Sequence, residues 1–170
     1  GDRFDLSSMP FRVTDVPGHT PSCILIHDKD NLMAFTGDFL VRDIASSPLI
    51  QRANVVPEGY KSLKSYITSL RKMRDMNFRV ALPGHGEIVE NPSTRINDLL
   101  AFIDEKRQRV LGILKKGAQT PVEISHELFP DLPPDQLFSG VCDVLGHLQI
   151  LEEEGLALRR GVGPVYFSAT

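Results

Sequence analysis

The chain has 170 residues, the size of one ordinary domain or of a medium domain with a small one attached. Its composition is 41% hydrophobic and 24% charged, which is globular and excludes a disordered chain. Basic residues number 19 and acidic residues 22, and the net charge of −3 gives no global signature of nucleic-acid or anionic-membrane binding. No apolar run approaches the roughly 20 residues that span a bilayer, so we expect no membrane partner.

The cysteine content indicates a cellular compartment, and the first residues indicate where the chain lies within a longer protein. Cys23 and Cys142 are too few and too far apart for a disulfide framework, so we expect reduced thiols. That favours a cytoplasmic protein, or a mitochondrial one if the source is eukaryotic. The chain opens at Gly1 without a methionine or a signal peptide, which we interpret as the middle of a longer protein.

The first part of the chain predicts short strands and one helix. Apolar runs between turn-forming residues predict strands at 4–6, 11–16, 23–26, 32–35 and 78–82. Four apolar residues in a row favour strands buried on both faces at 23–26 and 32–35. The polar stretch 41–57 predicts a long loop. A helix ending at Asn77 is then predicted by apolar residues at helical spacing, namely Leu63, Tyr66, Ile67, Leu70 and Met73.

The second part predicts three helices and a hairpin. The first helix is expected to be capped at Ser93 or Thr94 and the second at Thr120, with Glu123 completing a capping box. The third is expected over 137–154, and a hairpin over 156–158 and 165–167. This order is typical of a winged-helix domain. We expect it to have its own core, formed by Leu137, Val141, Leu145, Leu148, Tyr166 and Phe167.

Three glycine-marked turns each place a possible metal ligand at the end of a predicted strand. They are Pro17-Gly18-His19-Thr20-Pro21, Thr36-Gly37-Asp38 and Pro83-Gly84-His85-Gly86. Imidazole nitrogen and carboxylate oxygen suit zinc, and they also suit iron or manganese. Glycine beside a ligand permits unusual backbone angles and leaves room for an ion. One such turn is a weak signal, but three together indicate a metal site.

These turns resemble the later sequence motifs of the metallo-β-lactamase superfamily, which includes glyoxalase II-like thioesterases. In that pattern a Gly-His-Thr, a Gly-Asp and a Pro-Gly-His-Gly turn carry metal ligands, and they match His19, Asp38 and His85. The likeness covers roughly residues 1–92. The tail His147-Leu148-Gln149-Ile150-Leu151-Glu152-Glu153-Glu154-Gly155 resembles the winged-helix tail of β-lactamase-like protein 2 and related bacterial hydrolases.

The superfamily's first motif, His-x-His-x-Asp-His, is absent, since the five histidines are at 19, 27, 85, 126 and 147. The resemblance therefore implies an α/β (α+β) fold, the C-terminal half of an αββα sandwich followed by a winged helix. We expect residues 1–92 to belong to the catalytic domain, 93–116 to be a connecting helix and 117–170 to be the winged-helix domain. The N-terminal half of the catalytic domain is the expected partner, and a homodimer is a further expectation.

The resemblance implies a metal-dependent hydrolase. Two ions, zinc by preference, would lower the pKa of a bridging water, and the hydroxide would attack a thioester or a similar small ester. Asp38 would bridge both ions, while His19 and His85 would each complete one. The chain alone is expected to be inactive. The alternatives are phosphodiester hydrolysis of RNA, and a sulfur dioxygenase with a single iron that would not need His85.

The remaining polar residues have simpler interpretations. Arg42 and Arg52, in the loop after Asp38, are candidates for binding an acidic or phosphate-bearing substrate. His27 is expected to close a strand and meet solvent, whereas His126 and His147 are expected to be surface or packed histidines. The basic groups at 71–74 and 106–109 are most simply solvated helix faces.

The winged-helix order raises the alternative of a protein-binding or nucleic-acid-binding module. Residues 117–170 contain two basic and eight acidic residues, a net charge of −6, and the third helix has no lysine or arginine. Because phosphate binding requires cations, we expect no DNA binding by this tail. Its acidic surface would instead pack on its own catalytic domain or on a protein partner.

Overall fold

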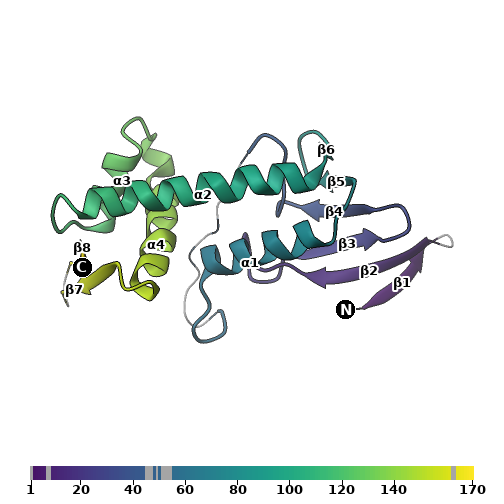
Figure 1. Cartoon of the computed structure of the whole chain (residues 1–170), viewed down its shortest axis with the longest axis horizontal. Helices are drawn as coiled ribbons and strands as arrows, with labels where there is room; N and C mark the ends of the chain where they lie inside the picture. Colours follow the sequence, from purple (N-terminus) through teal and green to yellow (C-terminus); the bar gives the residue numbers. More distant parts are fainter. Residues whose placement is uncertain (1, 7–8, 45–47, 49, 51–54, 162–163) are drawn as a thin grey trace. The chain divides into compact units, whose positions relative to one another are not determined.

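The computed structural model describes residues 2–6, 9–44, 48, 50, 55–161 and 164–170 (Figure 1). The chain forms two compact units, Gly1–Ala101 and Phe102–Thr170. The boundaries expected near residues 92 and 116 stay predictions, because a division by packing does not test which parts fold alone. Within the described residues, no helix combines the length and the apolar character needed to cross a membrane.

The first unit contains a mixed six-stranded sheet. Its strands lie in chain order and are β1 (Arg3–Leu6), β2 (Met9–Asp15), β3 (Ile24–Asp28), β4 (Met33–Gly37), β5 (Val80–Pro83) and β6 (Val89–Glu90). All neighbours are antiparallel except β4 and β5, which are parallel and are connected through helix α1 (Ser62–Asp75). The five strands predicted from the sequence are confirmed to within two residues, and β6 was not predicted.

The strand directions decide which turns share an edge of the sheet. Because β3 is antiparallel to both of its neighbours, β2 and β4 run the same way, as their arrows show in Figure 1. Strand β5 runs parallel to β4. The carboxyl ends of β2, β4 and β5 therefore meet the same edge of the sheet, and each of the three glycine-marked turns begins there.

One face of this sheet is buried under helices. Leu25, Ala34, Thr36 and Ala81 on that face are almost fully buried, and the buried side of α1 packs there through Tyr66, Leu70 and Met73. The expected core positions of Tyr66 and Met73 are confirmed.

His27 also lies on the buried face, and the expectation that it meets solvent is wrong. It is 1% exposed, its ring packs on Phe78 and its Nε2 lies 3.0 Å from the Thr14 hydroxyl oxygen. Burial lowers the pKa of His27, and the nearby Lys29 and Arg12 lower it further. The histidine lies inside β3 and not after it, because that strand continues through Asp28.

The opposite face of the sheet carries an apolar row that is only partly buried. Val13, Ile26, Phe35 and Leu82 are paired in register across β2 to β5, so their side chains share a face. Phe35 on this row is 42% exposed, and Ile24 on the same face is 43% exposed. The expectation that β3 and β4 are buried on both faces is therefore wrong for the described residues, although the apolar pattern that prompted it is present.

The second unit is helical with a two-stranded hairpin. Helix α2 (Pro92–Leu114) leads into it, and it continues with α3 (Pro121–Leu128), a 3₁₀ turn (Pro134–Gln136), α4 (Leu137–Glu153), β7 (Ala157–Arg160) and β8 (Tyr166–Ala169). Helix α2 begins one residue before the expected cap, since Pro92 needs no partner for a backbone N–H in the first turn. The capping box of Thr120 and Glu123 is confirmed. The winged-helix identity of this unit stays a prediction.

The core of the second unit includes the end of α2. Val110, Leu111, Ile113 and Leu114 are buried in it together with residues from α3, α4 and the hairpin, namely Ile124, Leu128, Val144, Leu148, Leu151, Ala157 and Phe167. Of the expected core, Leu148 and Phe167 are confirmed and Leu145 packs at the edge. Leu137 and Val141 are only half-buried and Tyr166 is 40% exposed, so those assignments are wrong.

A buried ion pair holds α2 to α4. The Lys106 ammonium lies 2.8 Å from both carboxylate oxygens of Asp143, and their side chains are only 12% and 8% exposed. Arg107 pairs with Glu154, and Arg109 donates to the Leu128 carbonyl. The interpretation as a solvated face is therefore wrong for Lys106 and Arg107, whereas Arg109 is exposed. A lysine on a helix does not reveal, from sequence alone, an acidic partner much later in the chain.

His147 is fully buried one helical turn after Asp143. Its Nε2 lies 4.0 Å from the Asp143 carboxylate, and neither ring nitrogen has a hydrogen-bond partner within the described part of the chain. Burial lowers the pKa of His147 to about 4; Asp143 acts against this shift, while Lys106 and Arg107 add to it. The expectation of a packed histidine is confirmed at this position.

We expect the protein to lose about 2 kcal/mol of stability between about pH 7 and pH 5 through His147. In the unfolded chain this histidine has its ordinary pKa of 6.5, whereas in the folded chain its pKa is about 4. The unfolded state therefore binds the extra proton over this interval, so acidification favours unfolding. Urea titrations at the two pH values measure the loss.

The matched comparison uses two histidines of the second unit. His147→Gln cannot titrate at this position and should reduce the difference between the two pH values. His126→Gln, at an exposed position on α3, should keep it. An unchanged pH difference in His147→Gln would contradict the assignment, whatever the absolute stability of that variant.

Candidate metal site

Asp38 and His85 face each other at the carboxyl edge of the sheet. Asp38 follows β4 and His85 follows β5, so the parallel pairing of these strands brings their turns together. The His85 Nε2 lies 3.5 Å from the Asp38 Oδ1, and each side chain is about half exposed, at 54% and 53%. A carboxylate oxygen and an imidazole nitrogen are thus close together and open to solvent.

Gly84 makes this contact sterically feasible. Its backbone N–H donates to the Gly37 carbonyl at 3.0 Å. A Cβ atom at residue 84 would lie 3.0 Å from the Asp38 Oδ1 and 3.4 Å from the Gly37 backbone. A side chain at residue 84 would therefore crowd the Asp38 carboxylate, and glycine avoids this close contact.

The turn that carries His19 packs against the backbone of α1. Gly18 is buried, and a Cβ atom there would lie 2.4 Å from the Tyr66 Cα, so only glycine fits. The Ser69 hydroxyl donates to the Pro17 carbonyl at 2.7 Å. On the other side of His19, the Thr20 hydroxyl oxygen lies 3.0 Å from the Cys23 Sγ. Contacts of neighbouring residues on both sides therefore position this histidine.

The three expected ligands share one edge of the sheet, and two of them are in contact. No group of three histidine, cysteine, aspartate or glutamate side chains close enough to hold an ion occurs within the described ranges. His19 is half-buried, and its Nδ1 is buried without a hydrogen-bond partner there. The side chains of Asp38 and His85 thus lie together, while the metal-ligand role of all three residues stays a prediction.

The chemistry of the pair fits a metal ion. Two ligand atoms that lie about 2.1 Å from one ion at a tetrahedral angle are about 3.4 Å apart. The observed 3.5 Å between Asp38 and His85 is close to this value, and both side chains are accessible. At the same edge, the Nδ1 of His19 is buried without a hydrogen-bond partner within the described residues. Such a buried polar atom is costly unless it is paired. The residues present can hold part of a metal site, and further ligands are needed to complete one.

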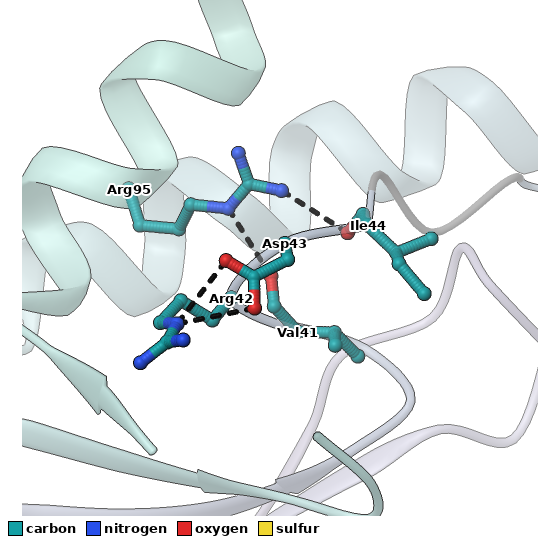
Figure 2. Close-up of polar contacts among 5 residues, drawn as sticks. All are labelled: Val41, Arg42, Asp43, Ile44 and Arg95. Carbon is teal, nitrogen blue, oxygen red and sulfur yellow. Dashed lines mark hydrogen bonds and ion pairs between the residues drawn. The ribbon is translucent and has the colours of Figure 1, made fainter. Parts of the chain in front are cut away.

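The segment after Asp38 is held by two helices. The Tyr66 hydroxyl of α1 donates to the Phe39 carbonyl at 3.0 Å. Figure 2 shows Arg95 of α2 reaching the carbonyls of Val41 and Ile44, each at 3.1 Å. Both helices contribute polar side chains here to backbone carbonyls that take no part in the strand pairing of the described residues.

Arg42 and Arg52 were expected to bind substrate. The Arg42 Nε donates to both carboxylate oxygens of Asp43 at 3.1 Å, as Figure 2 shows, and its side chain is half exposed. Arg52 lies outside the described residues. A role for either arginine in substrate binding stays a prediction.

Sequence inspection missed Tyr66, Ser69 and Arg95 as supports of the site. Tyr66 was assigned to the core only, because its spacing matches the apolar face of α1. Ser69 lies on that same face, three residues on, and is 3% exposed. A small polar residue among the buried positions of an amphipathic helix was the available signal, since a buried hydroxyl needs a partner.

The similarity searches identify a family for the first part of the chain. Residues 1–85, half of the 170, match the model of the metallo-beta-lactamase superfamily. Among solved structures, a metallo-beta-lactamase family protein from Thermus thermophilus superposes with a TM-score of 0.86 at 25% identity. That match covers all of this chain and 52% of the other.

Named relatives agree with this family. The Bacillus subtilis protein named "Probable metallo-hydrolase YqjP" is 31% identical over 147 residues, which is 84% of this chain and 44% of that protein. An atrochrysone carboxyl ACP thioesterase from Aspergillus fumigatus is 25% identical over 79% of this chain and 43% of its own length. A beta-lactamase-like protein 2 homolog from Drosophila melanogaster is 25% identical over 85% of this chain and 46% of its own length.

This chain therefore spans less than half the length of the named relatives that it matches. The family model, the fold and the three glycine-marked turns agree with one another. The chain belongs to the metallo-β-lactamase superfamily.

Proposed function

We propose that the protein containing this chain is a metal-dependent hydrolase that acts on a thioester or a similar small ester. The observation that carries the proposal is the contact of Asp38 with His85 at 3.5 Å, at the edge where the turn of His19 also begins. Family membership supports the reaction class, and the thioesterase named among the relatives supports the substrate class.

Three residues of this chain would hold the metal. Asp38 would bind between two ions, with His19 and His85 each completing one of them. When bound, divalent ions lower the pKa of a water molecule toward 7 and polarise the scissile carbonyl. Zinc suits this mixture of imidazole and carboxylate, and iron or manganese would suit it as well.

The packing around these residues supports orientation of the ligands before an ion binds. Gly84 leaves room for the Asp38 carboxylate beside it, and Gly18 allows the turn of His19 to pack closely on α1. Pre-formed geometry lowers the cost of assembling a site. The half-exposed side chains of Asp38 and His85 leave access for a small substrate.

We further propose that an upstream segment of the same protein covers the apolar row of Val13, Ile26, Phe35 and Leu82. A large apolar sheet face is costly in water, and exposed faces of this kind mark contact surfaces. The chain matches only about half of the Thermus structure, which leaves a comparable length of polypeptide to form the other half of the fold. The missing metal ligands would come from that segment.

The second unit is proposed to be a winged-helix tail of the kind that we associate with β-lactamase-like protein 2. The order of α2, α3, α4 and the β7–β8 hairpin supports this, as does the likeness to the Drosophila homolog. A reducing compartment such as the cytoplasm is supported by Cys23 and Cys142, which are both free thiols. A homodimer stays a prediction.

We expect His85→Ala in the complete protein to lower kcat for thioester hydrolysis by at least about 100-fold and to reduce bound zinc. The reason is that changes to the partners of metal ligands alone cost about 10–100-fold in metal affinity or activity, so loss of a direct ligand should cost more. Thioester turnover and metal content of the purified variant are the measurements.

His126→Ala is the matched control, since His126 is an exposed histidine on α3. It should keep both zinc and turnover. Full activity of His85→Ala with unchanged metal content would contradict the assignment. Sulfur dioxygenase activity in His85→Ala with iron alone, in place of thioester turnover, would favour the sulfur dioxygenase alternative, in which His85 is not a ligand.

We expect purified residues 1–170 to hydrolyse no thioester on their own. Three ligands cannot hold two ions that each keep an open position, so stoichiometric binding of two zinc ions should require the upstream segment. Turnover and zinc stoichiometry of residues 1–170, with and without an added upstream fragment, are the measurements. Turnover by residues 1–170 alone would overturn this expectation.

A further inference from the structure

Helix α1 contacts two of the three ligand turns with side chains from one face. Tyr66 and Ser69 lie three residues apart, so they project from the same side of the helix. Tyr66 contacts the segment after Asp38, and Ser69 contacts the turn before His19. One rigid helical turn therefore connects two loops that approach the sheet edge from different strands.

The contact of Tyr66 is both polar and apolar. Its hydroxyl donates to the Phe39 carbonyl at 3.0 Å, and its ring packs edge-on against the Phe39 ring at 5.3 Å. Both side chains are almost fully buried, at 1% and 0% exposed. The Thr36 hydroxyl donates to the Leu40 carbonyl at 2.9 Å and closes the same turn. The backbone on either side of Asp38 is therefore fixed.

The contact of Ser69 fixes the other turn. Its hydroxyl donates to the Pro17 carbonyl at 2.7 Å, two residues before His19. Between them, Gly18 lies directly on the Tyr66 backbone, where a Cβ atom would come within 2.4 Å of the Tyr66 Cα. The turn can therefore neither slide along α1 nor lift away from it without breaking this partly buried hydrogen bond.

We propose that Tyr66 and Ser69 are positioning residues that set the distance of His19 from the Asp38–His85 pair. This inference rests on the proposed metal-dependent function. The two hydroxyls act through backbone carbonyls of the ligand turns and do not contact the reacting atoms. Partners that orient ligands typically change metal affinity when they are removed, even where the fold is kept.

The test uses two variants that each remove one hydroxyl from the complete protein. Tyr66→Phe keeps the ring against Phe39 and removes the hydroxyl that donates to the Phe39 carbonyl. Ser69→Ala loses only the bond to Pro17. Each is expected to weaken zinc binding about tenfold, measured by competition with a chromogenic zinc chelator at a temperature where circular dichroism shows all variants folded.

Thr68→Ala is the matched control on the same helix. Its hydroxyl donates to the Lys64 carbonyl at 3.0 Å on the exposed face of α1, away from both ligand turns. It should leave zinc affinity unchanged. The Tm of each metal-free variant gives the stability effect separately, because a merely structural role would lower Tm without changing the affinity of the folded protein for zinc.

The outcomes separate this inference from the function on which it rests. Weaker zinc binding in Tyr66→Phe and Ser69→Ala, but not in Thr68→Ala, supports it. Zinc affinity equal to that of the unchanged protein in both variants overturns it and leaves the metal-dependent function intact. Absence of binding of zinc, iron and manganese alike by the unchanged protein overturns the proposed function and this inference with it.

Discussion

The direction in which β2, β4 and β5 run is the constraint on which the candidate site depends. Three turns far apart in the sequence meet because these strands all end at one edge of the sheet. The parallel pairing of β4 with β5 requires a crossover connection, and α1 supplies it. Helix α1, which connects the two parallel strands, is therefore also the element that contacts the turns of His19 and Asp38. The same helix links the strands and supports the candidate site.

The two faces of the sheet have different chemical roles. Helices cover one face, on which His27 with its lowered pKa is buried together with Leu25 and Ala34. The other face presents Ile24 and Phe35 to solvent at about 40% exposure each, although their strands have the composition of buried strands. The upstream segment proposed above would cover the second face, and it would also supply the further metal ligands, since the ligand edge borders both faces.

The sequence allowed the strands, α1 and the capping box at Thr120 to be predicted, because each follows from local periodicity or a local motif. The positions of Asp38 and His85 were predictable for a related reason, since each lies within two residues of the end of a strand. What local pattern does not contain is the partner of a side chain. The burial of His27, the pairing of Lys106 with Asp143 and the contacts of Tyr66 and Ser69 all depend on residues from other elements.

The buried pair of Lys106 and Asp143 also changes the electrostatics that bear on DNA binding. The net charge of −6 was counted over residues 117–170, but three of those acidic residues, Glu127, Asp143 and Glu154, pair with cations of the preceding segment. Over the whole second unit, residues 102–170, seven basic residues stand against ten acidic ones, a net charge of −3. The overall charge of the unit is therefore only mildly unfavourable for DNA. The stronger obstacle is local: α4 has no lysine or arginine along its length, and phosphate contacts from a helix in a groove require them.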